Sequence, residues 1–211
     1  PPGTPHLIRW VGNERGVAPY PCWSTVREGT SDDGTKEKNY AGTPEGSLWA
    51  PAEVDVPLRG SIWQWNPDEE HLVASQEDLV RMYYESVGRN CNLLLNAGPD
   101  KDGIIPEIDM KRYQEFGSEI RRRFEHPVAR TSGSGDKIVL NLPESQTINH
   151  VVLMEDIAQG ERVRKYIVEG LTKTNIWEKL CEGTLIGHKH IQQTEPREVS
   201  SIRLRIIESV A

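Results

Sequence analysis

The 211-residue sequence carries a formal net charge of −7, and its length suits one large domain or two small ones with a buried core. The negative net charge argues against a nucleic acid partner. The one basic cluster, at 121–123, falls at the end of an expected helix, where cations stabilise the helix dipole, so it has a structural explanation. No apolar run approaches the roughly 20 residues that span a bilayer, so we expect no membrane partner.

Three cysteines, Cys22, Cys91 and Cys181, are far apart in the sequence and show neither metal-ligand nor redox-motif spacing. We therefore expect no metal site, and the odd count leaves the redox compartment open. The chain begins Pro1-Pro2-Gly3 without an initiator methionine or a leader, which predicts a fragment or a processed protein.

The first expected element is a short strand at 6–12, followed by a loop at 13–16. Residues 27–46 are rich in glycine, serine, threonine, aspartate and lysine, which predicts a polar loop. Further along, 75–78 has a capping-box pattern and starts a helix that ends near Gly88.

An aromatic and acidic stretch occupies 47–65, with three tryptophans, Trp49, Trp63 and Trp65, around the acids Glu53 and Asp55. Rigid aromatic walls with a few polar groups are typical of ligand pockets, and sugars stack on such faces. The alternative is a loop that its aromatic residues pin to a core.

A short apolar run at 91–96 is typical of a strand buried on both faces of a parallel sheet. An apolar stripe at helical spacing predicts a second helix at 107–124. This alternation of strands and helices indicates a βα-repeat architecture.

Beyond a flexible connector at 131–135, the character of the sequence changes, and β-branched runs recur between polar turns. The runs lie at 137–142, 147–154, 161–169, 176–182 and 199–208. They predict an antiparallel β-sandwich. We therefore place two domains, at 1–130 and 131–211.

Four segments of the first domain carry a distinctive combination of residues. They are Arg9-Trp10-Val11-Gly12-Asn13-Glu14 with Trp23-Ser24, Trp49-Ala50-Pro51-Ala52-Glu53-Val54-Asp55, Val87-Gly88-Arg89-Asn90-Cys91-Asn92-Leu93-Leu94-Leu95-Asn96, and Gly98-Pro99-Asp100-Lys101-Asp102-Gly103. Together they resemble the C-terminal half of an α-L-fucosidase of glycoside hydrolase family 29. The fold class that this resemblance implies is α/β plus all-β: the C-terminal part of a (β/α)8-like barrel at 1–130, followed by an antiparallel β-sandwich at 131–211.

The resemblance implies a retaining exo-glycosidase that removes terminal α-L-fucose from oligosaccharides or glycoconjugates. One carboxylate attacks the anomeric carbon, and a second protonates the leaving oxygen and later activates water. The nucleophile of the family is an aspartate upstream of all four segments, so we expect this chain to lack it and to be inactive alone. The family needs no metal or organic cofactor, and its members work outside the cytosol, secreted, periplasmic or lysosomal.

Glu14 is the candidate acid/base, because the Gly12-Asn13-Glu14 segment resembles the subgroup that prefers α-1,3/1,4-linked fucose. It follows a strand at the carboxyl end, where barrel enzymes place their chemistry. We expect burial beside Trp10 or Trp23 to keep the acid form at neutral pH. The residues alone leave open a solvated loop glutamate without a role.

Two further carboxylates, Glu53 and Asp55, are candidates for contacts to sugar hydroxyls. The alternative is that one of them supports the loop through backbone N–H groups or through Arg59.

The candidate aromatic walls of the fucose site are Trp49 and one of Trp63 or Trp65, and Trp23 is a further candidate for substrate binding. The family has a Gly-Trp-aromatic run after the arginine, whereas this sequence has Gly60-Ser61-Ile62-Trp63-Gln64-Trp65, which leaves the choice between the last two open.

Two other functions remain as alternatives to a fucosidase. In the first alternative, the chain is a non-catalytic carbohydrate-binding or structural module. In the second, it belongs to a hydrolase of the same fold that acts on another sugar.

Overall fold

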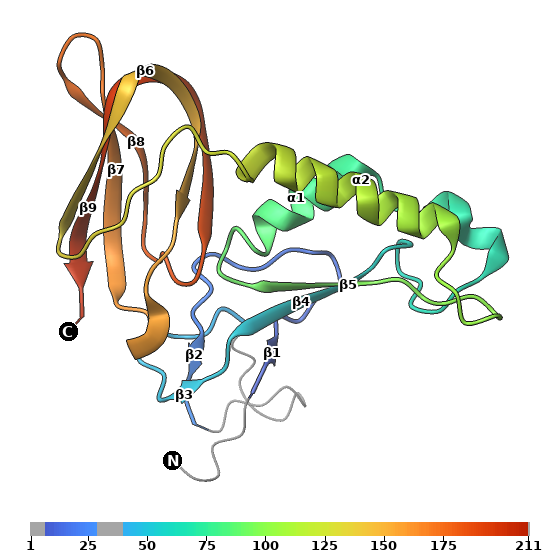
Figure 1. Ribbon diagram of the computed structural model, residues 1–211. Helices are drawn as coiled ribbons and strands as arrows, with labels where there is room; N and C mark the ends of the chain where they lie inside the picture. Colours follow the sequence, from blue (N-terminus) through green and yellow to red (C-terminus); the bar gives the residue numbers. More distant parts are fainter. Residues whose placement is uncertain (1–6, 29–39, 211) are drawn as a thin grey trace. The chain divides into compact units, whose positions relative to one another are not determined.

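The computed structural model describes residues 7–28 and 40–210, which form two compact units (Figure 1). The first unit ends at His126 and the second begins at Pro127. Of the polar loop expected at 27–46, residues 29–39 lie outside the described part of the chain.

A three-stranded parallel sheet forms the centre of the first unit, in the order β1 (Arg9–Trp10), β4 (Ala52–Pro57) and β5 (Asn92–Asn96). Trp10 is in register with Glu53, and Glu53 with Asn92, and all three strands are parallel, so their carboxyl ends point toward the same edge of the sheet. Parallel strands, with a helix between β4 and β5, agree with the predicted βα repeat. Closure of these strands into a barrel stays a prediction.

Two short antiparallel strands, β2 (Thr25–Val26) and β3 (Leu48–Trp49), form a separate small sheet that leads into β4. A 3₁₀ helix, η1 (Pro67–Leu72), follows β4 and begins at an Asn66 cap, whose side chain accepts from the N–H of Asp68.

The helix α1 (Gln76–Glu85) begins where the capping-box pattern predicts, because the Ser75 hydroxyl accepts from the backbone N–H of Asp78. The same hydroxyl donates to the Asp78 carboxylate and holds the pKa of that carboxyl below its usual value. The second helix, α2 (Glu107–Phe124), has the predicted bounds and ends in the arginine cluster at 121–123.

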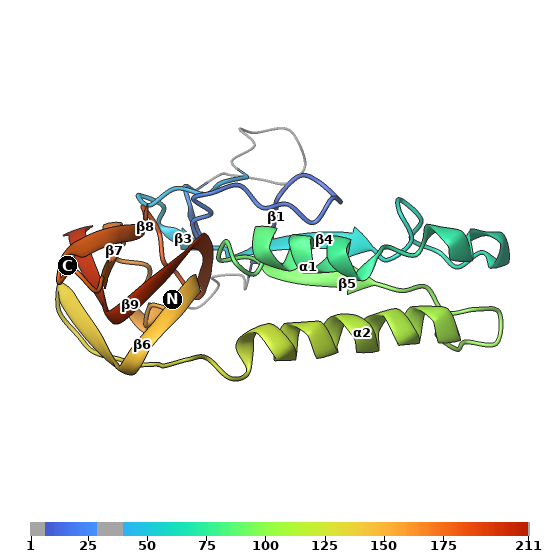
Figure 2. The ribbon, with the colours of Figure 1, turned by 90° about the horizontal axis from the view of Figure 1, so that it is seen from above.

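Both helices lie on the same side of the parallel sheet (Figures 1 and 2). On that side Val54 and Val56, at most 2% exposed, form a core with the half-buried Met82 of α1. The opposite side carries polar and exposed groups, and Leu94 there is 41% exposed. The prediction that 91–96 is buried on both faces is therefore wrong for the described chain, since helices cover only one face.

Two of the three cysteines, Cys22 and Cys91, lie in this same core although they are far apart in the sequence. A hydrogen bond with Cys22, together with burial, raises the pKa of the Cys91 thiol well above its ordinary value. The thiol of Cys91 is therefore protonated at neutral pH and packs as a small apolar side chain.

The second unit is one antiparallel sheet in the order β6 (Lys137–Leu153), β9 (His190–Ser209), β7 (Val163–Leu171) and β8 (Trp177–Gly183), with a 3₁₀ turn η2 (Ile157–Gln159). The runs predicted at 137–142 and 147–154 join into the single strand β6, because irregularities in its pairing with β9 bend the strand without ending it.

The bend brings the second half of β6 over β7, although the two strands are not neighbours in the sheet. Val151 of β6 packs with Tyr166 and Val168 of β7 in one buried cluster. A core between two layers of strands is consistent with the predicted β-sandwich.

Arg59 and Asp109 form a buried ion pair that joins the end of β4 to the first turn of α2. The guanidinium holds both carboxylate oxygens, at 3.1 Å from Nε to Oδ1 and 3.0 Å from Nη2 to Oδ2, and the two side chains are 4% and 1% exposed. Removal of one partner of such a pair destabilises the fold, because the other charge is left buried and unpaired.

We predict that Asp109→Asn lowers the free energy of unfolding by roughly 3–5 kcal/mol, measured by urea titration. Arg81→Gln is the matched control, since the Arg81–Glu85 ion pair is exposed on α1 and its loss costs less than about 1 kcal/mol. Equal losses in the two variants would contradict a buried, structural role for Asp109.

Candidate active site

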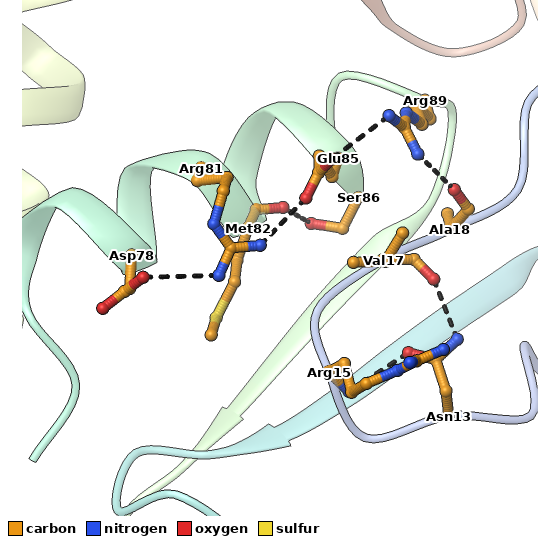
Figure 3. Close-up of polar contacts among 10 residues, drawn as sticks. All are labelled: Asn13, Arg15, Val17, Ala18, Asp78, Arg81, Met82, Glu85, Ser86 and Arg89. Atoms are coloured by element: carbon orange, nitrogen blue, oxygen red, sulfur yellow. Dashed lines mark hydrogen bonds and ion pairs between the residues drawn. The ribbon is translucent and has the colours of Figure 1, made fainter. Parts of the chain in front are cut away.

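The loop that carries Glu14 leaves the carboxyl end of β1 in a turn that Asn13 closes (Figure 3). Gly12 has φ of 80°, which favours glycine, and turns the chain. The Asn13 side chain then accepts from the backbone N–H of Arg15 at 3.1 Å and donates to the Val17 carbonyl at 2.9 Å. Both ends of the Asn13 amide are used, so the turn around Glu14 has a defined shape.

The same loop is tied to the C-terminal end of α1 (Figure 3). The N–H of Ala18 donates to the Glu85 carbonyl at 2.8 Å, and Arg89 donates to the Ala18 carbonyl at 2.7 Å. Gly16 lies so close to Met82 that an added Cβ would sit 2.4 Å from its Cγ. A helix on one side of the sheet thus fixes a loop at the edge of the sheet.

Two hydrogen bonds connect Glu14, Trp63 and Asn96, which follow or end three different strands of the sheet. The indole N–H of Trp63 donates to Oε2 of Glu14 at 3.0 Å. The Asn96 amide, at the last position of β5, donates to the Trp63 carbonyl at 2.9 Å. The loops after β1 and β4 and the end of β5 therefore contribute one group each, in the place where parallel sheets put their ligands.

The Arg59–Asp109 pair holds the loop that carries Trp63. Besides binding Asp109, Arg59 donates to the Asn66 carbonyl at 3.1 Å, and its own carbonyl accepts from the N–H of Ile62 at 3.0 Å. Trp63 is thus fixed from both sides along the chain as well as by Asn96.

A second polar cluster lies on the sheet face that the helices leave uncovered. The indole N–H of Trp10 donates to Asp55, and the Asn92 amide donates to Oε2 of Glu53 at 2.7 Å. Glu53 and Asp55 alternate along β4, so both carboxylates lie on this face, as the sequence predicts. Their hydrogen-bond partners are Asn92 and Trp10 rather than Arg59, so the alternative of a contact to Arg59 is wrong.

The tryptophans occupy different surroundings. Trp23 is buried, at 6% exposure, whereas Trp49 on β3 is 40% exposed. The indole nitrogen of Trp65 is buried and has no hydrogen-bond partner among the described residues, and its backbone N–H group packs against Gly98. Of the predicted aromatic residues, the structure brings Trp63 to Glu14.

The predicted surroundings of Glu14 need a correction. We expected burial beside Trp10 or Trp23, but Glu14 is exposed in the described structure, Trp10 binds Asp55, and Trp23 is part of the core. The reason is geometric: the turn at Asn13 directs Glu14 to the edge of the sheet, where the aromatic partner is Trp63.

Sequence reasoning did not single out Asp109 as a partner of Arg59, or Asn92 as a partner of Glu53. An available signal for Asn92 was the parallel register, which sets position 92 beside position 53. No comparable signal links Arg59 to a residue 50 positions away.

Within residues 7–28 and 40–210, no group of three His, Cys, Asp or Glu side chains is arranged to hold a metal ion. Among the same residues, no helix combines the length and apolar character needed to cross a membrane.

The fold and the site together define an α/β protein with a carboxylate, an indole and an amide at the carboxyl edge of a parallel sheet. In such proteins this edge is the ordinary location of ligand and catalytic groups.

Comparison with known proteins agrees with this class. The family model for alpha-L-fucosidase matches residues 24–123. A protein of Arabidopsis thaliana, alpha-L-fucosidase 1, is 31% identical over 221 residues, which cover 87% of this chain and 43% of that protein.

Two solved structures are similar over almost the whole chain. A protein of Bacteroides thetaiotaomicron assigned to the alpha-L-fucosidases is 40% identical with a TM-score of 0.92, covering 97% of this chain and 48% of that one. A glycoside hydrolase 29 family member from an unknown rumen bacterium is 30% identical with a TM-score of 0.82, covering 96% and 38%.

The chain belongs to the α-L-fucosidase family, glycoside hydrolase family 29, as the four sequence segments indicate. It spans about half the length, or less, of the relatives that it matches.

We predict that Gly12→Ala destabilises the first unit more than Gly103→Ala does, as measured by thermal unfolding. Both glycines have φ near 80°, so each substitution carries a backbone cost of about 1 kcal/mol. At Gly12 the added Cβ would also lie 2.3–2.6 Å from ring carbons of Tyr40, whereas nothing lies within 4 Å at Gly103. Equal melting temperatures for the two variants would contradict the close packing of Tyr40 on this turn.

Proposed function

We propose that this chain is part of a retaining α-L-fucosidase that removes terminal fucose, α-1,3/1,4-linked, from oligosaccharides or glycoconjugates, with Glu14 as the acid/base. The observation that carries the proposal is the meeting of Glu14 with Trp63 at the carboxyl edge of the parallel sheet, in a chain of this family. The family relationship supplies the reaction class, and the position of Glu14 supplies the residue.

In the first step of this reaction, Glu14 gives its proton to the glycosidic oxygen while the bond between that oxygen and the anomeric carbon breaks. A carboxylate nucleophile forms the covalent glycosyl-enzyme. In the second step Glu14 takes a proton from water, and the resulting hydroxide attacks the anomeric carbon and releases fucose.

The nucleophile in this proposal is an aspartate contributed by a part of the protein outside residues 1–211. Relatives about twice as long support this, because they contain room for the rest of a catalytic domain. Activity accordingly belongs to the complete protein, and the chain of 211 residues by itself is inactive.

The second polar cluster, with Glu53 and Asp55, is proposed to contact sugar hydroxyls. Asn92 donates to one oxygen of Glu53, and Trp10 donates to one oxygen of Asp55. These hydrogen bonds orient the two carboxylates for such contacts. Trp49, exposed on β3, is the proposed aromatic wall. Trp23 and Trp65 are proposed to support this site through packing.

We predict that Glu14→Gln, in the complete protein, lowers kcat/KM for a Lewis-type trisaccharide by roughly 10²- to 10⁴-fold, because a sugar leaving group needs the proton. The phenolate that leaves from an aryl α-L-fucoside with an acidic phenol needs little protonation. The rate at which this substrate forms the glycosyl-enzyme therefore falls far less. Burst kinetics with the aryl fucoside and steady-state rates with the trisaccharide measure the two effects.

Glu77→Gln is the matched control, since Glu77 is an exposed glutamate in the first turn of α1 and belongs to neither polar cluster of the site. Unchanged rates in Glu14→Gln would mean that another carboxylate is the proton donor, and Glu53→Gln would then be the next variant to measure. Binding of fucose without hydrolysis by the complete protein would favour the sugar-binding module instead.

A further inference from the structure

Only one of the two carboxylate oxygens of Glu14 has a partner in the described part of the chain. Oε2 accepts from the Trp63 indole at 3.0 Å, and no described group donates to Oε1. An indole nitrogen is a donor only, so this contact always fills an acceptor site on Oε2 and never removes a proton from it. The two oxygens of Glu14 are therefore unequal before any substrate binds.

The backbone of Trp63 is held by contacts that do not involve Glu14. Asn96 donates to its carbonyl at 2.9 Å, and the turn before it closes on Arg59, whose guanidinium is fixed by buried Asp109. These contacts come from β5, from the end of β4 and from α2. The backbone from which the Trp63 indole projects is therefore held by the fold independently of Glu14.

A general acid must present its proton in one direction, within hydrogen-bond reach of the leaving oxygen. Glu14 is an exposed side chain on a loop, and an exposed glutamate samples several rotamers unless a partner restrains it. The Trp63 indole supplies such a restraint through a hydrogen bond to one end of the carboxyl group.

We propose that Trp63 is a positioning residue for the acid/base: its N–H holds Oε2 of Glu14, so that Oε1 is the oxygen that gives a proton to the leaving oxygen and later takes one from water. This inference rests on the proposed function. It gives Trp63 a role in orienting Glu14 in place of the stacking role that the sequence leaves open between Trp63 and Trp65.

Trp63→Phe in the complete protein tests this role, because phenylalanine keeps an aromatic face and loses the N–H. We expect kcat/KM for a Lewis-type trisaccharide to fall roughly 10- to 100-fold, the loss typical of a hydrogen bond to a charged group, with KM little changed. For a 2-chloro-4-nitrophenyl α-L-fucoside, whose leaving group needs little protonation, we expect a change of less than about threefold.

Trp65→Phe is the matched control, since it makes the same chemical change two residues away. The Trp65 indole nitrogen has no partner in the described chain, so its loss removes no contact to Glu14. A packing or sugar-stacking role at Trp65 affects both substrates alike, because both carry the same fucose. The expected result is an altered ratio of the two kcat/KM values in Trp63→Phe and an unaltered ratio in Trp65→Phe.

Several results would overturn the inference. Equal losses on both substrates in Trp63→Phe, or a weaker affinity for free fucose in that variant, would make Trp63 a wall of the sugar site. If Trp63→Phe fails to fold by thermal unfolding, Asn96→Ala serves instead, since it releases the Trp63 carbonyl and is expected to shift the same ratio in the same direction. A wild-type protein without activity on either substrate would remove the proposed function itself, and the inference with it.

Discussion

The buried ion pair between Arg59 and Asp109 is the constraint on which the arrangement of the site depends. It joins the end of β4 to the first turn of α2, and it also anchors the loop at 59–66 through the Asn66 carbonyl. A guanidinium presents several donors in a rigid plane, so one buried arginine fixes a carboxylate and a carbonyl at the same time. The cost of burying both charges is offset only while every partner stays in place.

From this pair a sequence of contacts leads to Glu14. The anchored loop presents Trp63, Asn96 holds the Trp63 carbonyl, and the Trp63 indole holds Glu14. On the other side, the Asn13 turn and the end of α1 hold the loop on which Glu14 lies. Elements far from Glu14 in the sequence therefore hold the loop and the partner of this one exposed carboxyl group, which is how a rigid α/β scaffold would support the acid/base that we propose.

The sequence predicts both helices and the candidate acid/base. The contacts that hold the site depend on residues that are distant in the sequence. The Ser75 cap and the apolar stripe of 107–124 predict both helices, because capping and periodicity are local. The strand at 91–96 was expected to be buried on both faces, yet Leu94 is exposed, since an apolar run does not reveal what covers each face. The motif predicts Glu14 as the acid/base, but its partner Trp63 lies 49 residues away, and no spacing rule predicts that contact.

The most direct test of the account is a crystal structure of the complete protein as its Glu14→Gln variant, with an uncleaved α-fucosyl trisaccharide bound. The account predicts that the side-chain amide of residue 14 lies within about 3 Å of the glycosidic oxygen, with its other end still held by the Trp63 indole. A trisaccharide whose glycosidic oxygen lies beside Glu53 or Asp55, away from the carboxyl edge of the sheet, would contradict it.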